Sequence, residues 1–195
     1  MDVLEHRRAL IKYFKLSHEV GLNTLMGGNA SIRMGNRVLI TPTNAPKTEL
    51  TEEDLVEIDL DGNAILGNKR PSSEWRMHVM IYKSTSYGAV FHAHPPNVLT
   101  IMNAGIPLDE SFSELKSYAH GVAVVPYIEP GTQELADKVA EAMARGADLV
   151  MLEKHGAVAA AASIQEAFNK MEVLEMIAYV TLSSTNAKKA MRNIP

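Results

Sequence analysis

The connections between the expected β-strands constrain the fold more than any other feature of the chain. Ser31–Met34 and Arg37–Thr41 read as short strands joined by Gly35-Asn36, and a two-residue loop that begins with glycine suits a type II′ hairpin. Val56–Leu60 alternates apolar and charged residues, as a half-buried strand does, and Asp61-Gly62 turns it into another short strand. Hairpins join antiparallel strands, so a purely parallel sheet is not expected.

Amphipathic helices separate the remaining strands. We expect helices over 2–20, from Ser72 or Ser73 to Lys83, and over 97–103, 132–145 and 163–183, and strands over 88–94, 122–127, 148–153 and 157–161. The polar residues 186–195 are expected to fray. Strands that are connected partly by hairpins and partly by helices predict an α/β fold in which helices cover a mixed sheet.

Composition indicates an ordinary globular protein. The 195 residues are 46% hydrophobic and 22% charged, which suits one domain over residues 1–195. The net charge of −4 lacks the basic excess of a general nucleic-acid binder. No run approaches the ~18 apolar residues of a membrane span, and the charged start of the chain does not read as a signal peptide. We therefore expect a soluble, cytoplasmic protein without nucleic-acid or membrane partners.

A pair of histidines carries the clearest chemical signal. His92-Ala93-His94 ends an expected strand, and side chains two residues apart in a strand share a face, so both imidazoles can approach one metal ion. The chain has no cysteine, so a metal must be held by His, Asp or Glu. The alternative interpretation is two core histidines that each make a hydrogen bond.

A third ligand would complete a catalytic metal site. His155 follows another expected strand and precedes Gly156, while His120 precedes Gly121, and spacing alone does not choose between the two histidines. Three histidines with an open fourth position are typical of a catalytic zinc site rather than a structural one.

Ser72-Ser73-Glu74 stands where a helix is expected to begin. The serines can cap the helix, and hydroxyls beside free N–H groups at a helix N-terminus also bind phosphate well. Glu74 suits the helix dipole, but beside a metal and a phosphate pocket it could serve as a general base. His78, one turn later, is interpreted as a buried histidine bonded to Glu74 and not as a ligand.

Gly27-Gly28-Asn29-Ala30-Ser31 is a second segment suited to an anion. Successive glycines can form a concave group of N–H donors, and Asn29 and Ser31 add side-chain donors. Thr41-Pro42-Thr43 is a weaker candidate of the same kind. Lys47 and Arg70 could add positive charge nearby, but both are expected on the solvated surface.

Five motifs lie in the order and at the approximate spacing of a known family: Gly28-Asn29-Ala30-Ser31, Thr41-Pro42-Thr43, Ser72-Ser73-Glu74-Trp75, His92-Ala93-His94 and His155-Gly156. In these motifs the chain resembles the class II aldolase/adducin family, most closely the members that cleave L-fuculose 1-phosphate. The resemblance implies a three-layer α/β/α sandwich with a central mixed, largely antiparallel sheet. It also implies a homotetramer with active sites near subunit interfaces.

The resemblance implies a site and a reaction as well. Zn²⁺, or another divalent ion such as Mn²⁺ or Co²⁺, would be bound by His92, His94 and His155, with Glu74 approaching it in the resting enzyme. The phosphate of a ketose 1-phosphate would lie against Gly28, Asn29, Thr43, Asn44, Ser72 and Ser73. Cleavage to dihydroxyacetone phosphate and an aldehyde would pass through an enediolate that the metal stabilises, with Glu74 handling the proton at its carbon.

The chain departs from the family's pattern at two of these positions. Asn44 stands where the fuculose phosphate enzymes have a glycine in the phosphate loop, and asparagine can adopt the positive φ that such a loop requires. Glu114 lies near the place of a tyrosine that transfers a proton in those enzymes. Glu114 is therefore either a second catalytic residue or a surface carboxylate.

Other functions remain compatible with the same residues. The three histidines would also serve a 5-methylthioribulose-1-phosphate dehydratase, in which Glu114 removes a proton, a 5-deoxypentulose-phosphate aldolase or a pentulose-phosphate epimerase. An adducin-like interaction module would not need the metal histidines. A cupin would also carry two histidines on a strand, but cupins lack the long helices expected over 132–145 and 163–183.

Overall fold

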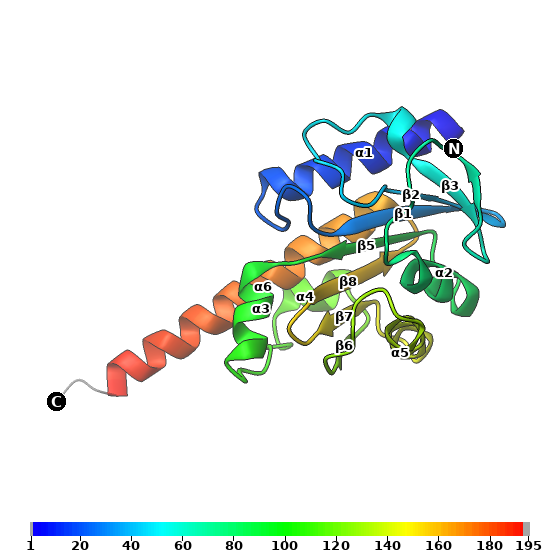
Figure 1. Ribbon diagram of the computed structural model, residues 1–195. Coiled ribbons are helices and arrows are strands. Elements are labelled where there is room, and N and C mark those ends of the chain that lie inside the picture. The colour runs from blue at the N-terminus through cyan, green and yellow to red at the C-terminus, as the bar shows by residue number, and fades with distance from the viewer. Residues whose placement is uncertain (1, 193–195) are drawn as a thin grey trace.

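The computed structural model describes residues 2–192, and its elements follow the predicted order along the chain (Figure 1). The strands are β1 (Asn29–Met34), β2 (Arg37–Ile40), β3 (Val56–Asp59), β4 (Ala64–Leu66), β5 (Ala89–Ala93), β6 (Val122–Val125), β7 (Leu149–Leu152) and β8 (Gly156–Ala161). The helices are α1 (Val3–Glu19), α2 (Trp75–Ser84), α3 (Pro96–Asn103), α4 (Ser113–Tyr118), α5 (Gln133–Ala144) and α6 (Ile164–Arg192), and a 3₁₀ turn, η1, spans Glu52–Asp54.

The eight strands form one sheet in the order β4-β3-β2-β1-β5-β8-β7-β6. Neighbouring strands are antiparallel except β6 and β7, which run parallel. The prediction of a mixed, largely antiparallel sheet is therefore confirmed. In the first hairpin Gly35 has φ +66°, the left-handed conformation that a type II′ turn requires of its first residue.

Helices cover both faces of this sheet (Figure 1). On one face α1, α3, α4 and α6 enclose a core in which Phe91 of β5 meets Phe168 of α6 edge to face, with ring centroids 5.5 Å apart. On the other face α2 and α5 enclose a second core, where Val90 of β5 lies with Tyr82 of α2 and Val139 of α5. The predicted three-layer α/β/α sandwich is confirmed.

The pleat of β5 decides which face receives the first histidine. Phe91 points to the α6 side, so its neighbour His92 points to the α2 side with Val90. His92 is completely buried there. The strand ends at Ala93, one residue earlier than predicted, and His94 follows directly at the rim.

Two elements near the histidines begin at other residues than predicted. β1 begins at Asn29 rather than two residues later, because its pairing with β5 extends that far. α2 begins at Trp75 with Glu74 as its N-cap, so the two preceding serines lie outside the helix. The Ser72 backbone N–H donates to the Thr41 carbonyl oxygen at 3.0 Å and ties this segment to the loop after β2.

The patterns do not predict η1 or α4, because three and six residues are too few to show a helical period. The expectation that residues 186–195 fray is wrong for the part that is described, since α6 continues to Arg192. Ala187, Lys188 and Lys189 are good helix formers, and basic residues suit the end of a helix. Residues 193–195 lie outside the described part. No helix within residues 2–192 is both long and apolar enough to cross a membrane.

Candidate metal centre

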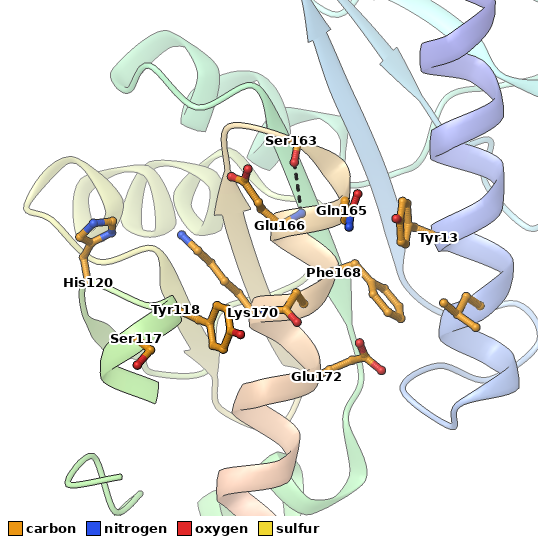
Figure 2. Close-up of a pocket in the computed structure, with 12 residues that line it drawn as sticks. Tyr13, Ser117, Tyr118, His120, Ser163, Gln165, Glu166, Phe168, Lys170 and Glu172 are labelled. Atoms are coloured by element: carbon orange, nitrogen blue, oxygen red, sulfur yellow. Dashed lines mark hydrogen bonds between the residues drawn. The ribbon is translucent and has the colours of Figure 1, made fainter. Parts of the chain in front are cut away.

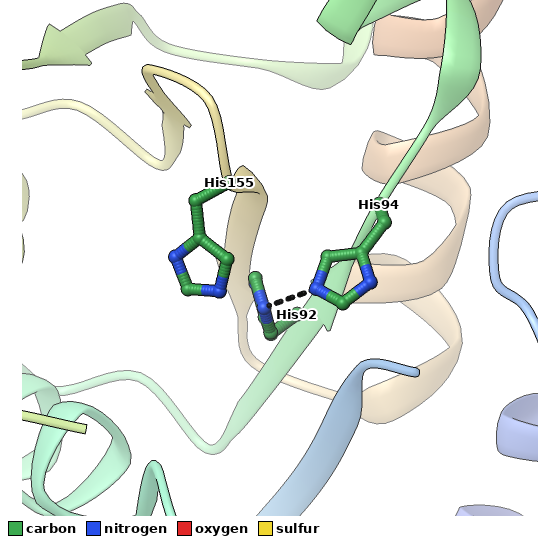
Figure 3. A group of neighbouring side chains, drawn as sticks. All are labelled: His92, His94 and His155. Atoms are coloured by element: carbon green, nitrogen blue, oxygen red, sulfur yellow. Dashed lines mark hydrogen bonds between the residues drawn. The ribbon is translucent and has the colours of Figure 1, made fainter. Parts of the chain in front are cut away.

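Three histidines from two segments far apart in the sequence converge at one end of the sheet (Figure 3). His92 is in β5, His94 follows that strand, and His155 lies in the turn between β7 and β8. One ring nitrogen from each lies within 4.8 Å of the others, and the Nε2 atoms of His92 and His94 are 3.1 Å apart. Among the described residues this is the one group of its kind.

Close approach of two backbones creates this convergence. β5 and β8 are paired so that Ala93 lies opposite Ala157, and the residue before β8's first member is His155. A Cβ atom at Gly156 would collide with the Ala93 carbonyl oxygen and would stand 2.8 Å from Cδ2 of His94. Only glycine lets the turn lie this close to the end of β5.

The ring nitrogens are arranged as metal donors. Nδ1 of His92 donates to the Ala157 carbonyl oxygen at 2.9 Å, which leaves Nε2 as the ring nitrogen that can bind a metal. Nε2 of His92 lies 3.1 Å from Nε2 of His94, and Nε2 of His155 faces the same place, 3.4 Å from Oε1 of Glu74. Burial lowers the pKa of His94 to about 3 and that of His155 to about 4, so both rings are neutral at pH 7. Burial opposes a charge on His92, but Glu74 beside it raises the pKa of that ring. The three ring nitrogens therefore fit a divalent cation when His92 gives up its Nε2 proton to make room for the ion.

Glu74 adds a carboxylate to the three rings. Its Oε2 lies 3.1 Å from Nε2 of His92, and its Oε1 lies 3.4 Å from Nε2 of His155. Burial opposes ionisation, but the charge and hydrogen bond of His92, followed by His155 and Asn29, hold the pKa of Glu74 well below its usual range. Oε1 has no hydrogen-bond partner. The donor set is thus three imidazoles and one ionised carboxylate, which suits Zn²⁺ or a similar ion.

His120 is not part of this group. Its side chain is 82% exposed, and its Nδ1 lies 2.8 Å from Asp148. Of the two histidines that spacing left open, position therefore favours His155, because it joins the group and His120 does not.

The predicted anion-binding segments surround a cavity of about 290 Å³ beside the histidines. His94, His155 and Glu74 line it, as do all six residues predicted for phosphate: Gly28, Asn29, Thr43, Asn44, Ser72 and Ser73. Asn44 has φ +51°, so it does adopt the left-handed conformation. Sequence reasoning missed Lys154, a cation with φ +57° that also lines the cavity and directly precedes His155.

The interpretation of His78 is partly wrong. It is completely buried and is not a ligand, as expected, but its ring does not bond to Glu74. Asn29 lies between them, with Nδ2 donating to Oε2 of Glu74 at 2.9 Å and Oδ1 lying 2.5 Å from Nε2 of His78. Burial lowers the pKa of His78 to about 3, so the ring is neutral. Ser31, expected to face an anion, instead bonds to His78 and Tyr82.

The prediction of a solvated Lys47 is wrong. Its side chain is completely buried, and the ammonium donates to the carbonyl oxygens of Thr24 at 2.9 Å, Leu25 at 3.4 Å and Gly27. Burial lowers the pKa of Lys47 to about 8, so the group is still charged at pH 7. Three carbonyl acceptors make this burial tolerable. Lys47 therefore holds the glycine-rich loop through its backbone carbonyl groups. Arg70, by contrast, is exposed as predicted.

One other sequence candidate lies apart from the cavity. Glu114 is exposed on α4 and is not among the residues that line it. A larger cavity of about 700 Å³ lies on the α1 and α6 side of the sheet (Figure 2). Two of the polar side chains that line it, Lys170 and His120, already bond to Asp148, Lys170 at 2.5 Å. The converging donors single out the smaller cavity as the functional one.

Known proteins resemble this chain along most of its length. The family model of the class II aldolase and adducin N-terminal domain matches residues 8–182. The chain is 36% identical over 192 residues to an L-fuculose phosphate aldolase of Methanocaldococcus jannaschii, which covers 97% of this chain and 100% of the relative. It is 36% identical over 184 residues to a 5-deoxy-D-ribulose 1-phosphate aldolase of Bacillus thuringiensis serovar kurstaki, covering 92% and 85% of the two chains.

A solved structure supports the same relationship. The fold matches that of an L-fuculose 1-phosphate aldolase with a TM-score of 0.87 and 33% sequence identity, over 93% of this chain and 87% of the other. The likeness is therefore one of sequence and of fold together.

Replacing one of the three histidines tests the metal centre. We expect His155→Ala to lower the affinity for Zn²⁺ by more than about a hundredfold, because loss of a direct ligand exceeds the 10–100-fold effect of its supporting residues. His120→Ala, outside the group, should bind as the unaltered protein does. The measurement is a competition titration with a coloured zinc chelator. Equal affinity in His155→Ala and His120→Ala would contradict the assignment.

Lys47→Met tests whether the buried ammonium fastens the loop. We expect a loss of about 1–3 kcal/mol in the free energy of unfolding, since the carbonyl groups of Thr24 and Gly27 lose their donor in a buried place. Lys15→Met is the matched control, because the ammonium of Lys15 also donates to a carbonyl oxygen but does so in an exposed place. Urea denaturation measures both. A Lys47→Met protein as stable as the control would contradict this. It would show that the free-energy cost of burying the ammonium equals the stabilisation that its hydrogen bonds provide.

Proposed function

This chain belongs to the class II aldolase and adducin family, and we propose that it is a metal-dependent aldolase acting on a ketose 1-phosphate such as L-fuculose 1-phosphate. The reaction would release dihydroxyacetone phosphate and an aldehyde, reversibly. The observation that carries the proposal is the cavity in which three imidazoles and Glu74 face the anion-binding segments. One end of a phosphorylated substrate can thus be held while its carbonyl group lies at the metal ligands.

The proposed cofactor is Zn²⁺, or another divalent ion such as Mn²⁺ or Co²⁺, held by His92, His94 and His155. Its donor set supports this, because neutral imidazoles and a carboxylate suit these ions. A cation there supplies a Lewis acid that stabilises negative charge on the substrate's carbonyl oxygen.

The phosphate group would lie among the loops of the cavity. Thr43, Ser72 and Ser73 offer hydroxyl donors, and the second amide hydrogen of Asn29 is free of protein partners. The backbone at Gly28 and Asn44, both at positive φ, bends around the same space. Lys154 would add a positive charge at the rim, so this chain has a cation where hydroxyl and backbone donors alone were expected.

Glu74 is the proposed general base and acid. It is ionised, it is buried beside the imidazoles, and one of its oxygens, Oε1, is free of hydrogen bonds. That oxygen can accept the proton from the carbon next to the carbonyl group when the reaction runs toward synthesis. In cleavage it returns the proton to the same carbon.

The remaining proposals concern the assembly and its surroundings. We treat residues 1–195 as one domain of a cytoplasmic homotetramer. Support comes from exposed apolar side chains around β6, the edge strand: Tyr118, Val124 and Tyr127. Glu114 is exposed and does not line the cavity of its own chain. A catalytic role for it would therefore require that it reaches the site of a neighbouring subunit.

A second substrate class has support from one relative. The Bacillus relative is named a 5-deoxy-D-ribulose 1-phosphate aldolase and matches this chain at 36% identity. A 5-deoxypentulose 1-phosphate differs from L-fuculose 1-phosphate only at the aldehyde end. The same metal ligands, phosphate loops and base would serve both substrates.

The proposed function is tested by product release. Metal-loaded protein is incubated with L-fuculose 1-phosphate or 5-deoxy-D-ribulose 1-phosphate, and dihydroxyacetone phosphate is measured by NADH oxidation through a coupling dehydrogenase. We expect release that EDTA abolishes and that added Zn²⁺, Mn²⁺ or Co²⁺ restores. Folded, metal-loaded protein that releases none from either substrate would contradict the proposal. Loss of water with an intact carbon skeleton from methylthioribulose 1-phosphate would instead identify the dehydratase.

Glu74→Gln separates metal binding from catalysis. We expect the variant to keep its metal, because three imidazoles remain, and to lose about 10²–10⁴-fold in kcat, because an amide cannot carry the proton. Glu153→Gln is the control, since Glu153 is an exposed carboxylate close in sequence to His155 that does not line the cavity. Steady-state kinetics and metal analysis are the measurements. Undiminished turnover in Glu74→Gln would remove Glu74 from the mechanism.

A further inference from the structure

A continuous line of buried hydrogen bonds leads from Glu74 into the protein interior. Asn29 bonds to Glu74 at 2.9 Å and to His78 at 2.5 Å. His78 Nδ1 lies 2.7 Å from the Ser31 hydroxyl, which lies 2.7 Å from the Tyr82 hydroxyl. All five side chains are less than a tenth exposed. The proposed reaction uses the metal ligands, Glu74 and the donors around the phosphate, and it assigns no role to His78, Ser31 or Tyr82.

Two regular elements hold the line in register. Asn29 and Ser31 are two residues apart on β1, so their side chains share one face of the sheet. Glu74, His78 and Tyr82 are spaced by four residues at the start of and along α2, so they share one face of the helix. The two faces meet, and their polar side chains alternate between strand and helix along the line. Because all five residues lie on β1 or α2, or at the N-cap of α2, regular secondary structure fixes each contact and no loop is involved.

The direction of every hydrogen bond follows from the carboxylate end. An ionised carboxylate only accepts, so Asn29 presents its NH₂ group to Glu74 and its carbonyl oxygen to His78. His78 must then donate from Nε2, and its neutral ring accepts at Nδ1 from the Ser31 hydroxyl. Ser31 in turn accepts from Tyr82, whose single hydroxyl hydrogen is shared between the Ser31 hydroxyl and the Ser31 carbonyl oxygen, 3.0 Å away. All donors therefore point toward Glu74.

We propose that His78 is a positioning residue for the aldolase reaction: by donating to Asn29 it locks the amide so that Asn29 holds Oε2 of Glu74 and leaves Oε1 free to transfer the proton. This inference rests on the proposed function of the same site. Without the His78 donor the Asn29 amide can rotate and turn its carbonyl oxygen toward the carboxylate. Glu74 would then lose its fixed position beside the imidazoles, although no direct contact with it had been removed.

Variants of His78 test the proposal. His78→Leu should lower kcat by about tenfold to a hundredfold, the scale of a misplaced catalytic group, with a smaller change in KM and unchanged zinc content. His78→Gln should recover much of kcat, because its side-chain amide can still donate to Asn29. Tyr82→Phe, at the far end of the line, should lower kcat less than His78→Leu does. Val79→Ala is the control for packing, since Val79 is buried next to His78 but makes no side-chain hydrogen bond.

Three results would overturn the inference. The first two require that the unaltered protein cleaves its substrate: a His78→Leu protein with the kcat of Val79→Ala, or a His78→Gln protein no better than His78→Leu. The third does not need substrate: ¹⁵N NMR of histidine-labelled, zinc-loaded protein should show His78 protonated at Nε2, and a proton at Nδ1 would mean that the hydrogen bonds run in the opposite direction. Absence of turnover in the unaltered protein would contradict the proposed function instead, and the NMR result would still decide the direction of the hydrogen bonds.

Discussion

The antiparallel pairing of β5 with β8 is the interaction on which the rest of the site depends. It places the end of one strand beside the start of the other, so that the turn after β7 sets His155 against His94. Side chains alternate along a strand, and a slip of one residue would turn His92 into the apolar core around Phe91. Gly156 permits the close approach, and the apolar cores on both faces hold the register. The proposed metal ligands, the cavity and the proposed base all lie where these two strands meet.

Buried polar groups give the site a single arrangement. An unpaired polar group in a low-dielectric interior is costly, so a set of such groups is stable only when each member is satisfied at once. Around Asn29 the amide can meet both Glu74 and His78 in one orientation only. Apolar packing would tolerate several rotamers at this place, whereas the hydrogen-bonded line between β1 and α2 does not. The same bonds that make the polar interior tolerable therefore also hold the carboxylate in position.

Local periodicity accounts for what the sequence could predict. The strand alternation places His92 and His94 together, and turn and helix signals locate nearly every element. Long-range contacts account for the errors. Lys47 is charged and was expected in solvent, but its carbonyl partners are in a loop about twenty residues earlier in the chain. His78 was paired with Glu74 by helical spacing, although β1 supplies the side chain that lies between them.

Lys47 also bears on the phosphate site proposed for the glycine-rich loop. The peptide group is planar and trans, so its N–H points opposite to its C=O. The carbonyl groups of Leu25 and Gly27 point at the Lys47 ammonium. The N–H groups of Met26 and Gly28 belong to the same two peptide groups and therefore point away from it. Met26 and Gly28 line the cavity. The buried cation thus fixes the orientation of these two peptide groups and adds its own positive charge beside the glycine-rich loop, which would favour the proposed phosphate.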